Sequence, residues 1–176
     1  MSEALIRDLI RDVPDFPKAG VMFKDITPVL ADARAFDAAI DLIVAPFADA
    51  GVTKVAGIEA RGFMFAAPIA CRLDAGFIPI RKPGKLPRDV VEQEYQLEYG
   101  TDRLQIHADA THAGERVLVV DDVLATGGTA AASVELLRRV GAEVVGVAVL
   151  LELLFLHGRA KLDGTPFHAV VSDGEG

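Results

Sequence analysis

Val-Leu-Val-Val-Asp-Asp-Val-Leu-Ala-Thr-Gly-Gly-Thr, residues 117–129, carries the strongest evidence on the fold. Its first four residues form an apolar run, typical of a strand buried on both faces of a parallel sheet that helices cover. Asp121 and Asp122 follow at the predicted end of this strand, where open α/β sheets bind their ligands. Residues 125–129 form a tight turn that opens into a helix, whose small first residues allow close packing.

The turn at residues 125–129 has the chemistry of a phosphate site. Its two glycines let the backbone approach an anion, and the first N–H groups of the following helix lack partners within the helix. The stretch has neither the Gly-x-x-x-x-Gly-Lys-Ser/Thr nor the Gly-x-Gly-x-x-Gly pattern of nucleotide-binding loops. We expect residues 126–129 to hold the phosphate of a sugar phosphate, and Asp121 and Asp122 to accept hydrogen bonds from ribose hydroxyls. Aspartates placed only as charges near a helix start would not explain the Thr-Gly-Gly-Thr.

The composition indicates one globular domain over residues 1–176. A chain of this length buries roughly 70% of the surface that its unfolded form exposes. Its net charge of −8, from 18 basic and 26 acidic residues, gives no general attraction to nucleic acid or anionic membranes. Cys71 is the sole cysteine, which excludes an intrachain disulfide and favours a reducing compartment. We expect Cys71 to be a small core residue.

No membrane segment is predicted. Charged residues interrupt the first 13 positions, which excludes a signal-peptide core. The longest apolar run, residues 144–156, contains Glu152 and is shorter than the roughly 18 to 20 residues that span a bilayer. We therefore expect a cytoplasmic protein without membrane or nucleic-acid partners, and Glu152 either to be paired within the protein or to face the site.

Strands and helices alternate along most of the chain, which predicts an α/β fold with a mainly parallel central sheet flanked by helices. A Pro- and Gly-punctuated loop, residues 13–28, is unusually apolar and is predicted to fold back over the core. The predicted helices lie at residues 2–11, 32–50, 63–73 and 130–140, and the predicted strands at residues 54–58, 76–80, 117–120, 143–151 and 167–171.

Residues 91–99 alternate between apolar and acidic side chains, and Leu104 and Ile106 resume this pattern after Gly100. A period of two indicates strands, so we predict an antiparallel ribbon that projects from the core within a flexible loop, residues 85–107. The ribbon's carboxylates are expected to be solvated, but the tip at residues 98–100 could close over a ligand and exclude water.

Two charged segments follow other predicted strands. Arg61 offers a planar fork to a phosphate and Gly62 allows close backbone approach, although an isolated turn of this kind is more often a solvated ion pair. A second phosphate-like turn in the same chain favours the functional interpretation. The basic cluster of Arg81, Lys82, Lys85 and Arg88 supports a solvated surface and an anion site about equally.

Together these segments resemble the type I phosphoribosyltransferase family. The apolar quartet, double acid and Thr-Gly-Gly-Thr at residues 117–129 are similar to its phosphoribosyl-pyrophosphate motif. The segments that are similar, in order and spacing, to the members acting on adenine are residues 16–28, 59–63, 81–87 and 95–100. The similarity runs from about Leu9 to Phe167.

The resemblance implies purine salvage, in which adenine and 5-phosphoribosyl 1-pyrophosphate give AMP and pyrophosphate. It also implies a homodimer and Mg²⁺ that is carried by the sugar diphosphate or pyrophosphate, with no certain protein ligand. By matched position, residues 1–28 would form a hood that recognises the base. Glu98 would exchange a proton with the purine or balance charge, and the tip with Tyr99 would cover the reaction.

The remaining site residues also follow from the resemblance. The implied catalytic residues are Arg61, Glu98, Asp121 and Asp122. The implied contacts to 5-phosphoribosyl 1-pyrophosphate are Ala60, Arg61, Gly62, Arg81, Lys82, Lys85, Tyr99, Asp121, Asp122, Ala125, Thr126, Gly127, Gly128 and Thr129. The implied contacts to adenine are Met22, Phe23, Lys24 and Leu153.

Lys24 departs from the family pattern, which more often has arginine at this position. Lysine lacks the planar guanidinium fork, so its packing at the base pocket remains open.

Two alternatives share the central motif. A regulator that binds the sugar phosphate without turnover would be expected to carry a basic DNA-binding domain, which this acidic chain lacks. A phosphoribosyltransferase for hypoxanthine, xanthine or orotate would differ in residues 16–28.

Overall fold

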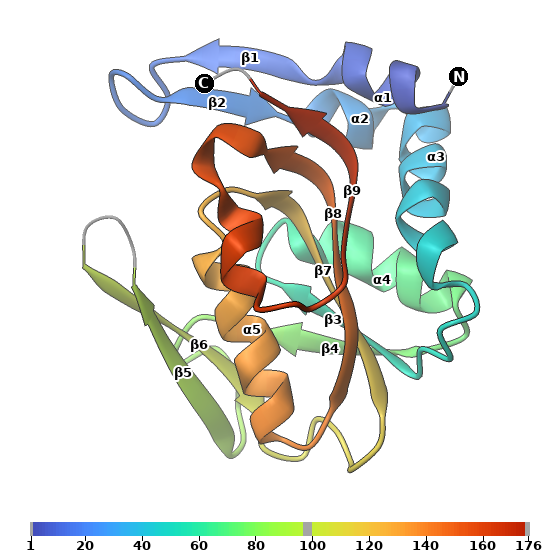
Figure 1. Cartoon of the computed structure of the whole chain (residues 1–176), viewed down its shortest axis with the longest axis vertical. Coiled ribbons are helices and arrows are strands. Elements are labelled where there is room, and N and C mark those ends of the chain that lie inside the picture. Colours follow the sequence, from blue (N-terminus) through green and yellow to red (C-terminus); the bar gives the residue numbers. More distant parts are fainter. Residues whose placement is uncertain (1, 97–99, 175–176) are drawn as a thin grey trace.

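The centre of the molecule is a five-stranded parallel sheet with the strand order β4-β3-β7-β8-β9 (Figure 1). The computed structural model describes residues 2–96 and 100–174. The strands are β3 (Lys54–Ile58), β4 (Gly76–Ile80), β7 (Arg116–Leu124), β8 (Glu143–Leu153) and β9 (Phe167–Asp173). The predicted α/β class with a mainly parallel sheet is confirmed.

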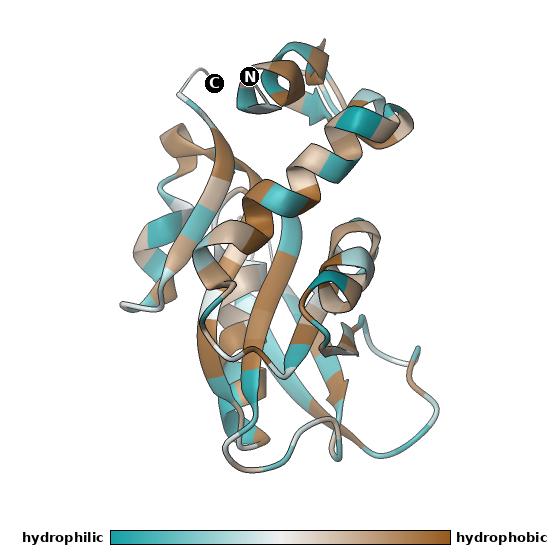
Figure 2. Ribbon diagram, turned by 90° about the vertical axis from the view of Figure 1, so that its right-hand side faces the viewer, coloured by the Kyte–Doolittle hydropathy of each residue, from teal (hydrophilic) through white to brown (hydrophobic). Residues whose placement is uncertain are grey.

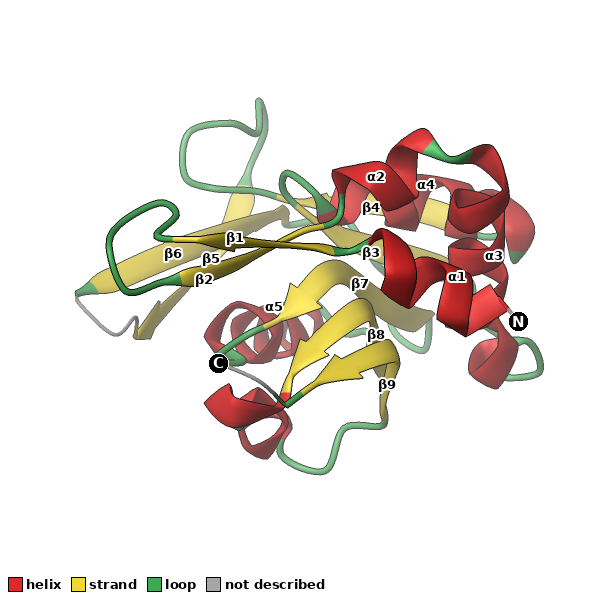
Figure 3. Ribbon diagram, turned by 90° about the horizontal axis from the view of Figure 1, so that it is seen from above, coloured by secondary structure: helices red, strands yellow, loops and turns green. Residues whose placement is uncertain are grey.

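Helices cover both faces of this sheet. Leu118 and Val120 of β7 pack with the helices α3 (Ala33–Val44) and α4 (Gly62–Arg72), whereas Val117 and Val119 pack with α5 (Gly128–Arg139). Figure 3 shows α3 and α4 on the side of the sheet opposite α5. Burial on both faces is the physical reason for the unbroken apolar run at residues 117–120.

The helices follow the expected amphipathic rule. In Figure 2, which looks onto the face with α3 and α4, brown runs along strands of the sheet, while teal and brown alternate along the helices. The Asp32 side chain caps α3 by accepting hydrogen bonds from the backbone N–H groups of Arg34 and Ala35. The described residues also form three short 3-10 helices: η1 (Ala45–Phe47), η2 (Leu154–Leu156) and η3 (Gly158–Leu162).

Cys71 corrects one prediction, because it is exposed rather than in the core. The buried face of α4 is occupied by Phe65, Ala66, Ile69 and Ala70, and Cys71 lies off this stripe. No helix within residues 2–96 and 100–174 is long and apolar enough to cross a membrane.

The hood is more structured than predicted. Helix α1 (Ser2–Leu9) ends before Arg11, and the segment predicted as a loop forms the antiparallel hairpin of β1 (Arg11–Pro14) and β2 (Met22–Asp25), followed by α2 (Thr27–Ala31). Ile26 is buried as expected of a segment covering the core, but Phe16 is half exposed and contacts Phe23 edge to face.

Lys24 fastens the hood to the edge strand β9. Its side chain is 5% exposed, and its Nζ lies 2.8 Å from Asp12 Oδ1 and forms an ion pair with Asp173 at the end of β9. Burial lowers the pKa of Lys24, but the hydrogen bonds and charges of the two aspartates outweigh it and leave the pKa raised. Arg7 adds a second tie, because its Nη1 donates to the Ser172 carbonyl at 3.1 Å.

The predicted antiparallel ribbon is confirmed as β5 (Val90–Gln96) and β6 (Thr101–His107). It projects past the sheet in Figure 1, but Leu104 and Ile106 are fully buried in the core beside α5. Arg139 Nη1 of α5 also donates to the Glu92 carbonyl at 2.8 Å. The ribbon's base is therefore part of the domain core. Its predicted tip, including Glu98 and Tyr99, lies outside the described residues.

Replacing Lys24 with methionine should lower the free energy of unfolding by about 1–3 kcal/mol, because it leaves Asp173 and Asp12 without their buried cation. Arg103→Met is the control: Arg103 pairs with Glu92 and Glu94 on the solvent side of the ribbon, and should cost less than about 1 kcal/mol. Urea unfolding measures both variants. Equal losses would contradict the fastening role of Lys24.

Candidate active site

A cavity of about 840 Å³ opens at the carboxyl ends of β3, β7 and β8, below the hood. The hood contributes residues 18–24, and the turns after β3 and β7 contribute residues 59–61 and 125–129. The cavity therefore collects the predicted base segment and both predicted phosphate turns. The described residues that line it also include Ile58, Lys82, Asp121, Asp122, Val123, Leu124, Ala130, Val149, Leu153, Phe155 and Leu156.

Asp121 and Asp122 lie within β7, not beyond its end as predicted. Strand β3 pairs with β7 only as far as Gly57 and Val120, whereas β8 continues to pair as far as Leu124 and Glu152. The two aspartates therefore occupy a strand that has lost its neighbour on one side. This one-sided extension could not be read from the apolar run, because the aspartates interrupt it.

The two carboxylates lie in different surroundings. Burial, and then the charge of Asp122, raise the pKa of Asp121 well above its usual 3.8. Asp121 Oδ1 accepts a hydrogen bond from the Asp122 backbone N–H at 2.9 Å, which favours its charged form but does not reverse the shift.

Asp122 is 4% exposed, and Arg61 is its counter-ion. Arg61 Nε lies 2.7 Å from Asp122 Oδ2, yet this buried oxygen accepts no hydrogen bond within the described residues. The guanidinium also lies 5.3 Å from the centre of the Phe23 ring. Buried polar atoms normally have a hydrogen-bond partner, so Asp122 Oδ2 retains unused acceptor capacity within the site.

Gly62 packs behind the carboxylates and does not line the cavity. A Cβ at this position would lie 2.9 Å from both Asp121 Oδ1 and the Val120 carbonyl oxygen. The start of α4 thus closes against the part of β7 that β3 leaves unpaired. Ala60, one residue before Arg61, does line the cavity, and the Glu59–Ala60 peptide bond is cis.

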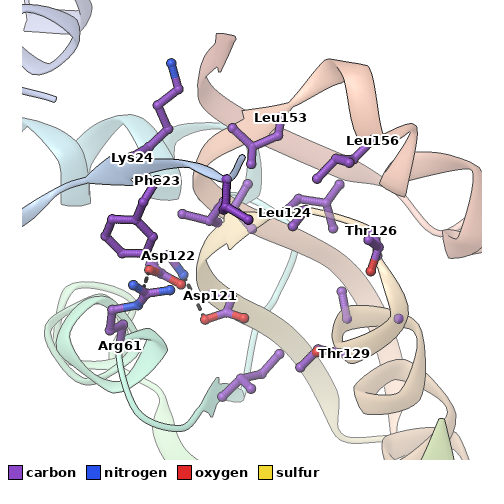
Figure 4. A pocket seen from close by; sticks show the side chains of 18 of the residues that line it. Phe23, Lys24, Arg61, Asp121, Asp122, Leu124, Thr126, Thr129, Leu153 and Leu156 are labelled. Carbon is purple, nitrogen blue, oxygen red and sulfur yellow. Dashed lines mark hydrogen bonds and ion pairs between the residues drawn. The ribbon is translucent and has the colours of Figure 1, made fainter. Parts of the chain in front are cut away.

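The second turn has the geometry of an anion site. Gly127 is the N-cap of α5 with φ +78°, and no side chain of the described residues caps this helix. The first N–H groups of α5 are therefore free of side-chain acceptors at a helix end that favours negative charge. In Figure 4, Thr126 and Thr129 lie across Asp121 from Arg61, so the carboxylates are seen between the two predicted anion sites.

The end of the cavity where the base is predicted to bind is apolar. Met22, Phe23 and Leu153, the implied adenine contacts, line it together with Phe155 and Leu156. The last two were missed, although the apolar residues directly after Glu152 were the signal that could have identified them. Lys24 borders the cavity, but its side chain points away from it (Figure 4), because neighbouring residues of a strand face opposite sides.

Three members of the predicted basic cluster divide into two groups. Lys82 lines the cavity, where its Nζ donates to the Tyr95 hydroxyl at 2.8 Å and pairs with Asp102. Arg81 and Lys85 instead donate to the Glu59 carboxylate, at 2.7 and 2.9 Å, and do not line the cavity.

Glu59 is buried between these two cations. Burial raises the pKa of Glu59, but the hydrogen bonds from Lys85 and Arg81 outweigh it and leave the pKa lowered. Glu152 is also paired: it accepts from Arg159 Nε at 3.1 Å, which confirms one of its two predicted roles.

Sequence comparisons place the chain among proteins that transfer phosphoribosyl groups. The family model of the phosphoribosyl transferase domain matches residues 27–167. A Streptomyces coelicolor protein named adenine phosphoribosyltransferase is 56% identical over 172 residues, which cover 96% of this chain and 94% of that protein.

Solved structures give the same result. The crystal structure of adenine phosphoribosyltransferase from Rhodothermus marinus matches with a TM-score of 0.94 and 49% identity over 98% of both chains. The enzyme from Trypanosoma brucei, in complex with AMP, pyrophosphate and ribose-5-phosphate, matches with a TM-score of 0.86 and 26% identity over 97% of this chain and 79% of that one. The chain therefore belongs to the phosphoribosyltransferase family and, within it, to the group of the adenine phosphoribosyltransferases.

Proposed function

We propose that the protein transfers the phosphoribosyl group of 5-phosphoribosyl 1-pyrophosphate to adenine, giving AMP and pyrophosphate in purine salvage. The observation that carries this proposal is the arrangement of one cavity: an apolar end, a carboxylate pair with one oxygen that accepts no hydrogen bond from the described residues, and a helix start without a side-chain cap. These match a purine ring, the hydroxyls of a ribose and a 5-phosphate. The relatives named for this activity support the choice of adenine.

The substrate is proposed to lie along the cavity with its 5-phosphate at residues 125–129. Asp121 and Asp122 then accept hydrogen bonds from the ribose 2- and 3-hydroxyls, and the purine packs between Phe23 and the apolar residues after β8. The pyrophosphate group lies toward residues 60–62 and Lys82. Arg81 and Lys85 donate hydrogen bonds to Glu59, so each must break its bond to Glu59 before it can contact the pyrophosphate.

The chemical step breaks the bond between C1 of the ribose and the pyrophosphate oxygen, and forms the bond from C1 to a purine nitrogen. Positive charge develops on the ribose and negative charge on the leaving group. The carboxylates of Asp121 and Asp122 stabilise the positive charge on the ribose, and Arg61 and Lys82 stabilise the negative charge on the pyrophosphate. Glu98, outside the described residues, is proposed to exchange the proton that the purine must lose.

Magnesium is proposed as the cofactor. Within residues 2–96 and 100–174, no group of three or more His, Cys, Asp or Glu side chains is placed to hold a metal. The carboxylates of Asp121 and Asp122 are hard oxygen ligands, and a Mg²⁺ ion usually takes the rest of its shell from substrate phosphates and water. When bound, the ion would neutralise charge on the departing pyrophosphate.

We also propose a homodimer located in the cytoplasm. The family resemblance implies the dimer, and Met64 of α4 and Phe77 of β4 each expose a large apolar side chain that a partner subunit would cover. The location is supported by the single cysteine of the sequence, which leaves no intrachain disulfide.

A panel of bases tests the proposed function. With 5-phosphoribosyl 1-pyrophosphate and Mg²⁺, adenine should release pyrophosphate, whereas guanine, hypoxanthine, xanthine and orotate should show kcat/KM values at least about 100-fold lower. A sensitive pyrophosphate assay measures all five. Binding of the sugar diphosphate without pyrophosphate release from any base would indicate a regulator and would sink the enzyme assignment.

Asp121→Asn should make the protein more stable and less active. The pKa of Asp121 is raised in the folded state, so its charged form destabilises folding at pH 8, and asparagine should add about 1–2 kcal/mol there. The gain should shrink as the pH falls through the raised pKa, and vanish below about 3.8, where Asp121 is protonated whether folded or unfolded.

Urea unfolding at pH 8 and near pH 4 measures this effect. Asp109→Asn is the matched control, because the hydrogen bond from Arg88 lowers the pKa of this exposed carboxylate and its replacement should not stabilise the protein. An Asp121→Asn variant that is less stable than the wild type at pH 8 would contradict the account of the carboxylate pair.

A further inference from the structure

The turn between η2 and η3 touches the predicted phosphate turn backbone to backbone. A Cβ at Gly158 would lie 2.2 Å from the Ala125 carbonyl oxygen and 2.9 Å from the Gly127 nitrogen. A Cβ at Gly127 would lie 2.1 Å from the Gly158 carbonyl oxygen. Any residue larger than glycine at position 127 or 158 would collide with the facing backbone. The backbone of residues 125–127 therefore packs directly on Gly158, which is buried.

Glu152 and Arg159 anchor the segment that carries Gly158. Glu152 is 4% exposed near the end of β8, opposite Leu124 of β7, and both of its carboxylate oxygens contact the Arg159 guanidinium. Arg159 also lies over the Phe167 ring, with 4.6 Å from its Cζ to the ring centre. Because Arg159 directly follows Gly158, this pair fixes the position of Gly158 relative to the sheet.

The other end of η3 is held against α5. Leu162 is buried in the core cluster that contains Val134 and Leu137 of α5. Arg138 Nη2 of α5 donates to Thr165 Oγ1 at 3.1 Å. The segment 158–165 is thus attached to the sheet by Arg159 and to the helix that begins at the phosphate turn by Leu162 and Thr165.

We propose that Gly158, held by the Glu152–Arg159 pair, is a positioning residue that gives the phosphate turn at residues 125–129 its binding geometry. The inference rests on the proposed function, because it takes this turn as the site of the 5-phosphate. Neither Glu152 nor Arg159 needs to touch the substrate for this role. Since the same chain segment supplies Phe155 and Leu156 to the apolar end, it joins the base and phosphate ends of the cavity.

AMP and adenosine provide the test, because they differ only in the 5-phosphate. Calorimetric titration gives the Kd of each, and their ratio isolates the contribution of the phosphate. Gly158→Ala should weaken AMP binding by about 10- to 100-fold, since the added methyl displaces the turn, and should change adenosine binding by less than about threefold. Arg159→Met should weaken AMP binding by about three- to tenfold, and Arg159→Lys should recover part of that loss.

Two controls separate positioning from general loss of stability. Gly164→Ala strains a backbone with φ +72° in the same region but meets no atom within 4 Å. Arg103→Met removes an arginine that is 54% exposed, against 58% for Arg159, from an ion pair on the ribbon. Both controls should keep the wild-type ratio of AMP to adenosine affinity, even where thermal unfolding shows them to be destabilised.

The outcomes distinguish the two proposals. A folded Gly158→Ala variant, or Arg159→Met if the first does not fold, that keeps the wild-type ratio would overturn the positioning role alone. Equal weakening of AMP and adenosine would also overturn it, because the effect would then be general. A wild-type protein that binds AMP no more tightly than adenosine would instead overturn the proposed function.

Discussion

The site depends on one feature of the sheet: β7 extends beyond the end of the neighbouring strand β3. From this pair the chain winds in opposite directions, through α4 to β4 on one side and through α5 to β8 on the other. The two crossover helices therefore cover opposite faces, and their N-termini flank the gap where β3 stops at Ile58 and β7 continues. A crevice at such a reversal of strand order is where open α/β sheets bind ligands. Here one N-terminus presents Arg61 and the other presents residues 125–129.

The same extension of β7 explains why the site destabilises the fold. Beyond Val120 the free side of β7 is occupied by Gly62 and Arg61 instead of a strand, and two adjacent carboxylates are brought to a poorly solvated position. Burial, and then repulsion from Asp122, raise the pKa of Asp121, and Arg61 compensates the charge of Asp122 without donating a hydrogen bond to its Oδ2. Such unfavourable arrangements are typical of functional sites, where binding a ligand supplies the missing partners.

The parts of this architecture that could be predicted are those set by local pattern. Strands at residues 54–58 and 76–80 have the predicted bounds, and Asp32 caps α3 as expected. The motif at residues 117–129 and its resemblance to a family also identified most residues that line the cavity. What could not be predicted depends on partners distant in sequence. The hood hairpin consists of short paired strands, Lys24 turns toward Asp173 near the opposite end of the chain, and Glu59 captures Arg81 and Lys85. The contact between Gly127 and Gly158 likewise has no signature in either segment alone.

The central claim is that the carboxylates on the unpaired extension of β7 bind ribose hydroxyls. The affinities of AMP and 2′-deoxy-AMP, measured on the wild type and on Asp122→Asn, test it most directly. The account predicts that the wild type binds AMP about 10- to 100-fold more tightly than the deoxy form, since a hydrogen bond to a charged group is worth about 1.5–3 kcal/mol. Asp122→Asn should lose most of that preference while binding 2′-deoxy-AMP nearly as the wild type does. A variant that discriminates the two nucleotides as well as the wild type would contradict the account.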